Sequence, residues 1–138
     1  YNLHSLTVGT TEDPTISRMT IGVTSDDVTF EQIKKQLNRM VEVIKVMDLT
    51  DTATHMKEIL YVKIMNITPE ERTEAFQIAQ VFRVDVVDIG ADSVLLECML
   101  KERKNNELIA LLKTRFKRIN VVRGGAVAIE AISTKCRE

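Results

Sequence analysis

The sequence has few of the residues from which disulfide frameworks and metal sites are built. Among its 138 residues are two cysteines, two histidines and no tryptophan. Cys98, Cys136, His4 and His55 show none of the spacings typical of zinc ligands. A disulfide framework would need more cysteines than two. These counts exclude a disulfide-rich domain and a zinc site.

The chain also lacks an excess of charge of either sign and any long apolar run. Its 19 basic and 20 acidic side chains leave a formal net charge of −1, which argues against duplex nucleic acid or an anionic membrane surface as a partner. No apolar stretch approaches the roughly 18 residues of a membrane helix, and no secretory signal opens the sequence. We therefore expect a cytoplasmic protein in a reducing environment.

Motifs for catalysis are missing as well. The sequence has no glycine-rich phosphate loop, and no serine or cysteine stands in a nucleophile motif. Glu12 and Asp13 precede a proline, which is typical of a solvated turn rather than a metal or acid–base site. The single triplet 123–125 (RGG) predicts a turn. We expect a chain that is not itself an enzyme.

The first part of the sequence predicts a hairpin followed by a helix. Apolar residues alternate within residues 3–8 and again within residues 16–23, with an acidic, proline-containing turn between them. Helical spacing then extends over residues 30–40, and Thr29 with Gln32 matches a capping box.

A third strand and a domain boundary are predicted next. Residues 41–49 (VEVIKVMDL) have the composition of a strand. The polar segment 50–54 (TDTAT) then separates two predicted domains, residues 1–50 and residues 55–138.

Beyond this segment the order of the predicted elements is β-α-β-β-α-β. A strand over residues 58–65 precedes a helix that Thr68, Pro69 and Glu71 open with a cap, a first-turn proline and a capping-box acid. A hairpin is predicted next, over residues 84–100 with its turn at 90–92. A helix follows whose inner face is formed by Leu108, Leu111, Leu112 and Phe116, and a closing strand begins at residue 121.

This order is that of the ferredoxin-like fold, so the predicted class is α+β. The first domain reads β-β-α-β, which matches the second domain without its opening strand and helix. In this fold the opening strand lies between the third and fourth strands, and without it their backbone groups would be unpaired. Tyr1 stands two residues before a strand-like run. We therefore expect about 20 further residues upstream, one strand and one helix.

The motifs of the first third resemble one family closely. Residues 1–9 (YNLHSLTVG), 11–21 (TEDPTISRMTI) and 31–46 (EQIKKQLNRMVEVIKV) follow one another. This succession is similar to the ACT domain of the small, regulatory subunit of acetolactate (acetohydroxyacid) synthase. Residues 58–64 (EILYVKI) and 78–89 (IAQVFRVDVVDI) match the same family more loosely, so the resemblance spans nearly the whole chain.

The resemblance implies two ACT-like units in tandem, the first without its opening strand and helix, in a non-catalytic regulatory subunit. In that family the small subunit forms homodimers through its ACT domains and binds the catalytic (large) subunit of acetolactate synthase. It activates this subunit and confers feedback inhibition by valine in branched-chain amino acid biosynthesis. Thiamine diphosphate, magnesium and FAD are then expected on the catalytic subunit, and no cofactor is expected in this chain.

The resemblance also implies where an effector would bind. In family dimers valine lies between edge-paired ACT domains, and the start of the second strand supplies one contact, matched here by Asn2 with Leu3 beside it. The other contact, an N-x-x-G loop, is absent from this sequence. Thr7, Gly9 and Gln32 match positions at which the family's feedback response can be altered. A side-chain amide suits an amino-acid ligand because it offers both a donor and an acceptor. From composition alone, an asparagine beside a strand start is more typical of a turn.

Two other classes stay open at this level. ACT-like folds also sense amino acids in transcription regulators, which would need a helix-turn-helix module upstream. A small enzyme on a ferredoxin-like scaffold is the third class, and the absence of spaced catalytic groups argues against it.

Overall fold

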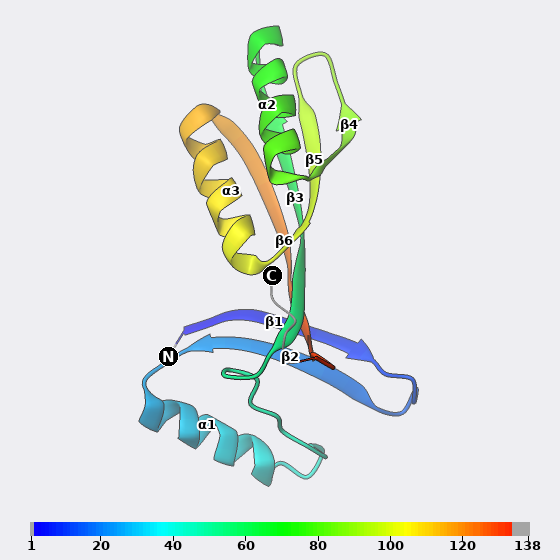
Figure 1. Cartoon of the computed structure of the whole chain (residues 1–138), viewed down its shortest axis with the longest axis vertical. Coiled ribbons are helices and arrows are strands. Elements are labelled where there is room, and N and C mark those ends of the chain that lie inside the picture. Colours follow the sequence, from blue (N-terminus) through cyan, green and yellow to red (C-terminus); the bar gives the residue numbers. More distant parts are fainter. Residues whose placement is uncertain (1, 134–138) are drawn as a thin grey trace. The chain divides into compact units, whose positions relative to one another are not determined.

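The computed structural model describes residues 2–133 and contains two compact units. The first comprises residues up to Met56 together with those from Val127 onward, and the second comprises Lys57–Ala126. Tyr1 and Cys136 lie outside the described residues. The described residues form nine elements (Figure 1): β1 (Asn2–Thr10), β2 (Ser17–Thr24), α1 (Asp27–Arg39), β3 (Thr54–Met65), α2 (Pro69–Phe82), β4 (Asp85–Ile89), β5 (Val94–Leu100), α3 (Glu102–Arg115) and β6 (Arg118–Glu130).

The second unit has the predicted ferredoxin-like order, β-α-β-β-α-β. Its four strands form a sheet in the order β4-β5-β3-β6, so that the first and last strands lie side by side. The pairs β3–β5 and β4–β5 are antiparallel. The α+β class and the hairpin of β4 and β5 are confirmed, and the hairpin closes with the amide of Gly90 donating to the carbonyl of Ser93 at 2.9 Å.

Strand β3 supplies the centre of the core because its residues alternate between the two faces of the sheet. Leu60, Val62 and Ile64 are completely buried. The helices pack small and branched side chains against them, as the helical spacing predicted. The cluster includes Ala75 and Ala79 of α2, Leu108 and Leu112 of α3, and Leu96 and Cys98 of β5.

The start of α2 follows the predicted capping box closely. The Thr68 hydroxyl accepts from the amide of Glu71 at 3.1 Å, and the Glu71 carboxylate accepts from the amide of Thr68 at 2.9 Å. Such reciprocal bonds satisfy two amides that a helix start leaves without partners. The helix ends at Arg83 in the left-handed conformation, with φ 59°.

A polar network around the buried Glu58 carboxylate ties α3 to the sheet. Glu58 of β3 is 3% exposed and accepts two bonds from the Arg123 guanidinium, at 2.7 and 3.2 Å. Asn105 of α3 donates to the same carboxylate at 3.0 Å. Burial raises the pKa of Glu58, but the bonds from Arg123 and Asn105 outweigh it and hold that pKa below its usual value. These bonds keep the carboxylate charged inside the unit.

The first unit contains a two-stranded ribbon and a helix. β1 and β2 pair antiparallel, with an irregularity between Leu3 and Ser5. The helix α1 begins earlier than predicted, because its N-cap is Asp26 rather than Thr29. The Asp26 carboxylate accepts from the amide of Thr29 at 2.7 Å, and this bond lowers the pKa of Asp26. The predicted capping box of Thr29 and Gln32 is therefore wrong.

The strand predicted over residues 41–49 is also wrong, because these residues form no strand in the structure. Val41 and Ile44 are 95% and 80% exposed. In the ferredoxin-like order this strand pairs with the opening strand of its own domain, as β6 pairs with β3 in the second unit. The described residues of the first unit contain no such strand. Residues 41–49 have the sequence pattern of a strand, but the strand that would pair with them is not among the described residues.

The glycine turn predicted at residues 123–125 is wrong as well. Strand β6 runs without interruption from Arg118 to Glu130 and includes both glycines. A Cβ on Gly124 would lie 2.4 Å from Cγ2 of Ile59, and Gly125 has φ 85°. The two glycines let β6 pass close to β3 with a local change of conformation.

This close approach gives a stability prediction. Gly124→Ala should destabilise the protein by about 1–3 kcal/mol, since the new methyl group overlaps the Ile59 side chain. Gly9→Ala is the matched control, because a Cβ at Gly9 would meet nothing within 4 Å. Denaturant unfolding measures both variants. Equal stability of the two would contradict the packing described for β6.

Candidate effector site

The residues that the sequence assigns to an effector site all lie in the first unit. Asn2 begins β1 and stands opposite Thr24, and Leu3 stands opposite Val23. The end of the ribbon therefore presents a polar pair, an amide and a hydroxyl, next to an apolar pair. Facing residues of antiparallel strands have Cα atoms about 4.5–5.5 Å apart. Because side chains alternate along a strand, the polar pair and the apolar pair point to opposite faces of the ribbon.

The other candidate residues are not gathered around Asn2. Thr7 stands opposite Thr20, and Gly9 stands opposite Arg18 near the far end of β1. Gly9 lies seven positions along the strand from Asn2, a distance of about 24 Å. Gln32 lies in the middle of α1 and is exposed. Asn2 and Leu3 are thus neighbours at one end of β1, whereas Thr7 and Gly9 lie farther along the strand and Gln32 lies on a helix.

The two faces of the ribbon differ in chemistry. Leu6 pairs with Ile21 and Val8 pairs with Met19, so these four apolar side chains share one face. Each of them is at least 40% exposed. The opposite face carries Ser5, Thr7 and Gly9. The ribbon therefore has one face with exposed apolar side chains and one that is mostly polar or small.

The sequence analysis did not identify Gly22 as important for the ribbon. A Cβ at Gly22 would lie 3.0 Å from Cε1 of His4 and 3.1 Å from Cβ of Ser5. His4 stands at the irregularity in β1, and its ring lies over the glycine. The signal in the sequence was a glycine inside a strand pattern, which marks a bulge or a close approach.

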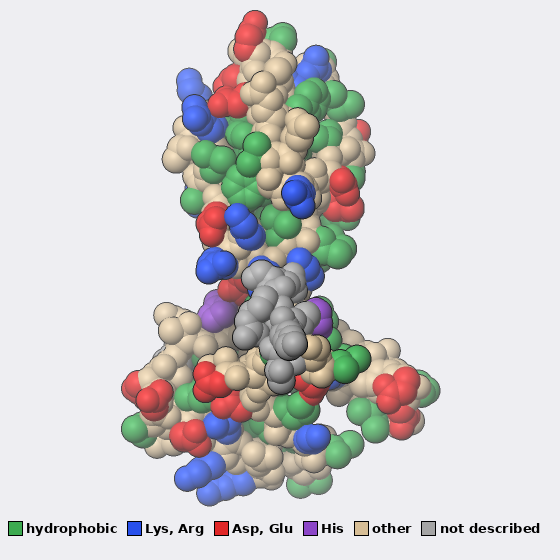
Figure 2. Space-filling view, in the orientation of Figure 1, with side chains coloured by type: hydrophobic (Ala, Val, Ile, Leu, Met, Phe, Trp, Pro, Cys, Tyr) green, Lys and Arg blue, Asp and Glu red, His purple; other side chains and the backbone are tan. Residues whose placement is uncertain are grey.

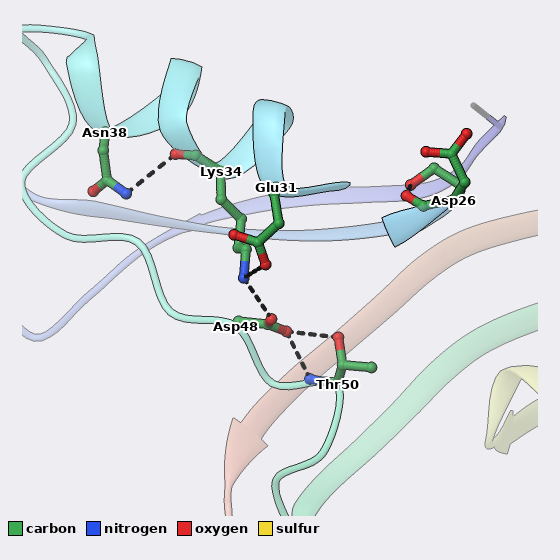
Figure 3. A network of polar contacts seen from close by, with 7 residues as sticks. Asp26, Glu31, Lys34, Asn38, Asp48 and Thr50 are labelled. Atoms are coloured by element: carbon green, nitrogen blue, oxygen red, sulfur yellow. Dashed lines mark hydrogen bonds and ion pairs between the residues drawn. The ribbon is translucent and has the colours of Figure 1, made fainter. Parts of the chain in front are cut away.

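A polar cluster fixes the segment after α1, and the sequence analysis missed it too (Figure 3). Lys34 of α1 contacts Glu31 at 2.8 Å and Asp48 at 3.1 Å. Asp48 also accepts from the hydroxyl of Thr50 at 2.6 Å and from its amide at 3.0 Å. This Asp-x-Thr turn holds the end of the segment 41–49 against the helix. The turn composition was visible in the sequence, but its partner on α1 was not.

The ribbon is connected to the closing residues of the first unit by one ion pair. Arg18 of β2 lies 3.3 Å from Glu130 at the end of β6. Asp13, in the turn between β1 and β2, accepts hydrogen bonds from the amide and hydroxyl of Thr15, as expected for a solvated turn.

Within the part of the chain that the structure describes, no group of three or more His, Cys, Asp or Glu side chains could hold a metal ion. No helix among these residues is long and apolar enough to cross a membrane.

Comparison with known proteins extends the match to both units. The family model described as the small subunit of acetolactate synthase matches residues 57–132. The chain belongs to this family. The model described as the AHAS small subunit-like ACT domain matches residues 1–45, which contain every candidate effector residue. The family membership selects the small-subunit class from the three that the sequence left open.

Individual small subunits show the same relationship. The acetolactate synthase small subunit of Aquifex aeolicus is 41% identical over 113 residues, which are 82% of this chain and 59% of that protein. That of Haemophilus influenzae is 34% identical over 129 residues, 94% of this chain and 78% of that protein. The crystal structure of the small subunit from Thermotoga maritima superposes with a TM-score of 0.80 at 32% identity, covering 96% of this chain and 81% of that one.

The Asp48 cluster leads to a prediction about pH. The bonds from the side chain and amide of Thr50, with Lys34, lower the pKa of Asp48 from 3.8 to about 2. A lowered pKa means that the folded state prefers the charged carboxylate. The cluster therefore stabilises the segment fully above pH 3.8 and loses this effect as the pH falls toward 2.

NMR titration of the Asp48 carboxyl carbon measures this directly. The midpoint should lie near 2 in the natural protein, and Thr50→Val should move it toward 3.8 because the hydroxyl donor is lost. Thr52→Val, a matched change two residues further on, should leave it unchanged. A midpoint near 3.8 in the natural protein would show that the turn is not formed.

Proposed function

We propose that this protein is a regulatory subunit of acetolactate synthase that binds the catalytic subunit and raises its activity. The observation that carries the proposal is the match of both units to small-subunit families, over residues 1–45 and 57–132. The described residues also contain no cluster of metal-ligating side chains. Thiamine diphosphate, magnesium and FAD would belong to the catalytic subunit, which carries out the reaction.

We further propose that valine is the effector and that it binds at the Asn2 end of the ribbon. The Asn2 amide and the Thr24 hydroxyl provide donors and an acceptor for the carboxylate and ammonium of an amino acid. Leu3 and Val23 point to the opposite face of the ribbon, where Leu3 is 54% exposed. A second copy of the chain packed against the Asn2 face would therefore supply the apolar contact for the isopropyl group.

The proposed mechanism is a coupling of binding free energies. Valine would bind one arrangement of the small subunit more tightly, and that arrangement would activate the catalytic subunit less. Couplings of this kind are typically about 1–3 kcal/mol, or about 5- to 150-fold in affinity.

Activity measurements test both parts of the proposal. Adding the full chain to its catalytic subunit should raise the rate of acetolactate formation several-fold, and valine should reverse most of this rise. Asn2→Ala should preserve the activation and raise the valine concentration for half-inhibition by about 10-fold, which corresponds to the loss of one hydrogen bond to a charged group.

Asn38→Ala is the matched control for this variant. Asn38 is an exposed asparagine of the same unit whose amide donates to the carbonyl of Lys34 at 3.1 Å, and its replacement should leave valine inhibition unchanged. No activation by the natural protein would refute the regulatory role. Activation with equal valine sensitivity in natural protein and Asn2→Ala would refute the site alone.

A further inference from the structure

The second unit contains one charged side chain that is not part of its surface. On the face in view in Figure 2, acidic and basic side chains lie interspersed at the surface. Among the described residues, Glu58 is the one charged residue that is buried. A buried charge is unfavourable unless it is paired and hydrogen-bonded, and an apolar side chain of similar size is often at least as stable in its place. Packing alone therefore does not explain a carboxylate at this position.

The Glu58 carboxylate is bonded to the strand β6 and to the helix α3. Arg123 of β6 donates two bonds to it, at 2.7 and 3.2 Å, and Asn105 of α3 donates a third at 3.0 Å. The backbone amide of Gly125 donates to it as well. Asn105 also donates to the backbone carbonyl of Glu58, at 3.1 Å. The network thus holds the backbone of β3 at Glu58 and the backbone of β6 at Gly125.

Gly125 departs from the extended conformation of its strand. Its φ is 85°, whereas an extended strand has negative φ. Glycine adopts positive and negative φ about equally readily, so this residue has two accessible backbone conformations. In the observed one its amide reaches the Glu58 carboxylate. The carboxylate therefore favours the conformation with positive φ over the extended one.

The observed arrangement leaves one polar atom of the network without a partner. Asn105 is completely buried, and its Oδ1 accepts no hydrogen bond from the residues that the structure describes. A buried acceptor without a donor is unfavourable. A second arrangement that brings a donor to this oxygen would offset the loss of the Gly125 bond. The network therefore has the properties of a two-state element.

The network lies where two strands continue from the second unit into the first. The second unit comprises Lys57–Ala126, so Glu58 and Gly125 each stand one residue inside its bounds. β3 and β6 are neighbours in the sheet, and each also contributes residues to the first unit. In the first unit, Glu130 at the end of β6 contacts Arg18 of the ribbon. One strand thus runs from an ion pair with the ribbon to the Glu58 network.

We propose that Glu58 and Asn105 are positioning residues for the regulation. They hold β6 in one of two conformations at Gly125, and effector binding in the first unit acts on the second unit by changing which conformation is populated. This inference rests on the proposed function, from which it takes the effector and the catalytic subunit. The residues act through the backbone of β6, a single element that groups in both units contact. Loss of the network should therefore separate effector binding from its effect.

Hydrogen exchange measured by NMR on the full chain tests the network itself. Glu58→Gln keeps the shape of the side chain and removes its charge. The Gly125 amide should exchange at least ten times faster in this variant than in the natural protein, while the amide of the buried Val62 keeps its rate, which marks a local change. Glu74→Gln is the matched control and should change neither rate. Glu74 of α2 pairs with Arg115 at 3.4 Å and belongs to neither β3 nor β6.

Rate and binding measurements on the complex with the catalytic subunit test the regulatory part. The natural protein and Glu58→Gln should both activate the catalytic subunit, and calorimetry should give valine dissociation constants within twofold of each other. The ratio of the rates without and with saturating valine should be at least threefold smaller for Glu58→Gln. A merely structural role would weaken activation, valine binding and inhibition together.

Asn105→Ala decides the matter if Glu58→Gln does not fold. It leaves the pair of Glu58 and Arg123 in place and removes the unpartnered oxygen, and it should show the same separation of binding from inhibition. Three results would overturn the proposal: unchanged exchange of the Gly125 amide in the folded variants, inhibition by valine as in the natural protein, or a loss of valine binding as large as the loss of inhibition. Failure of the natural protein to activate the catalytic subunit or to bind valine would refute the proposed function, and this coupling with it.

Discussion

The second unit depends on the alternation of side chains along β3. This strand lies between β5 and β6 in the sheet, and its even-numbered residues from Leu60 to Ile64 form the centre of the core. The same alternation places Tyr61 and Lys63 on the other face. A single strand therefore determines where the helices pack and which surface stays open. Glu58, the even-numbered residue before Leu60, also points to the helix side, where its buried carboxylate pairs with Arg123.

The first unit repeats part of the element order of the second. Its hairpin and helix follow the order of β4, β5 and α3 in the second unit, so the repeat inferred from the sequence holds for these elements. The segment 41–49 has the apolar pattern of the closing strand and remains outside a sheet. Backbone pairing, more than residue preference, decides whether a strand forms.

Sequence reasoning succeeded where a single local pattern decides the structure. The capping box of Thr68 and Glu71 and the hairpin at Gly90 both depend on residues close together in the sequence. It failed where a distant residue decides. The sequence around Gly124 predicts a turn, but the structure packs Ile59 against this glycine within a strand. The partner of Asp48 is Lys34 on α1, fourteen residues away. The candidate site was only partly predictable for the same reason. The motif assigned Asn2 and Gly9 to the effector response, but they lie near opposite ends of β1.

We propose that this member of the small-subunit family acts by binding a catalytic subunit. Calorimetric titration of the catalytic subunit with this protein, with and without valine, measures that binding. Binding should be saturable, and valine should change the subunit affinity by the same factor by which the catalytic subunit changes the affinity for valine. Absence of any complex at concentrations that saturate related small subunits would contradict the claim.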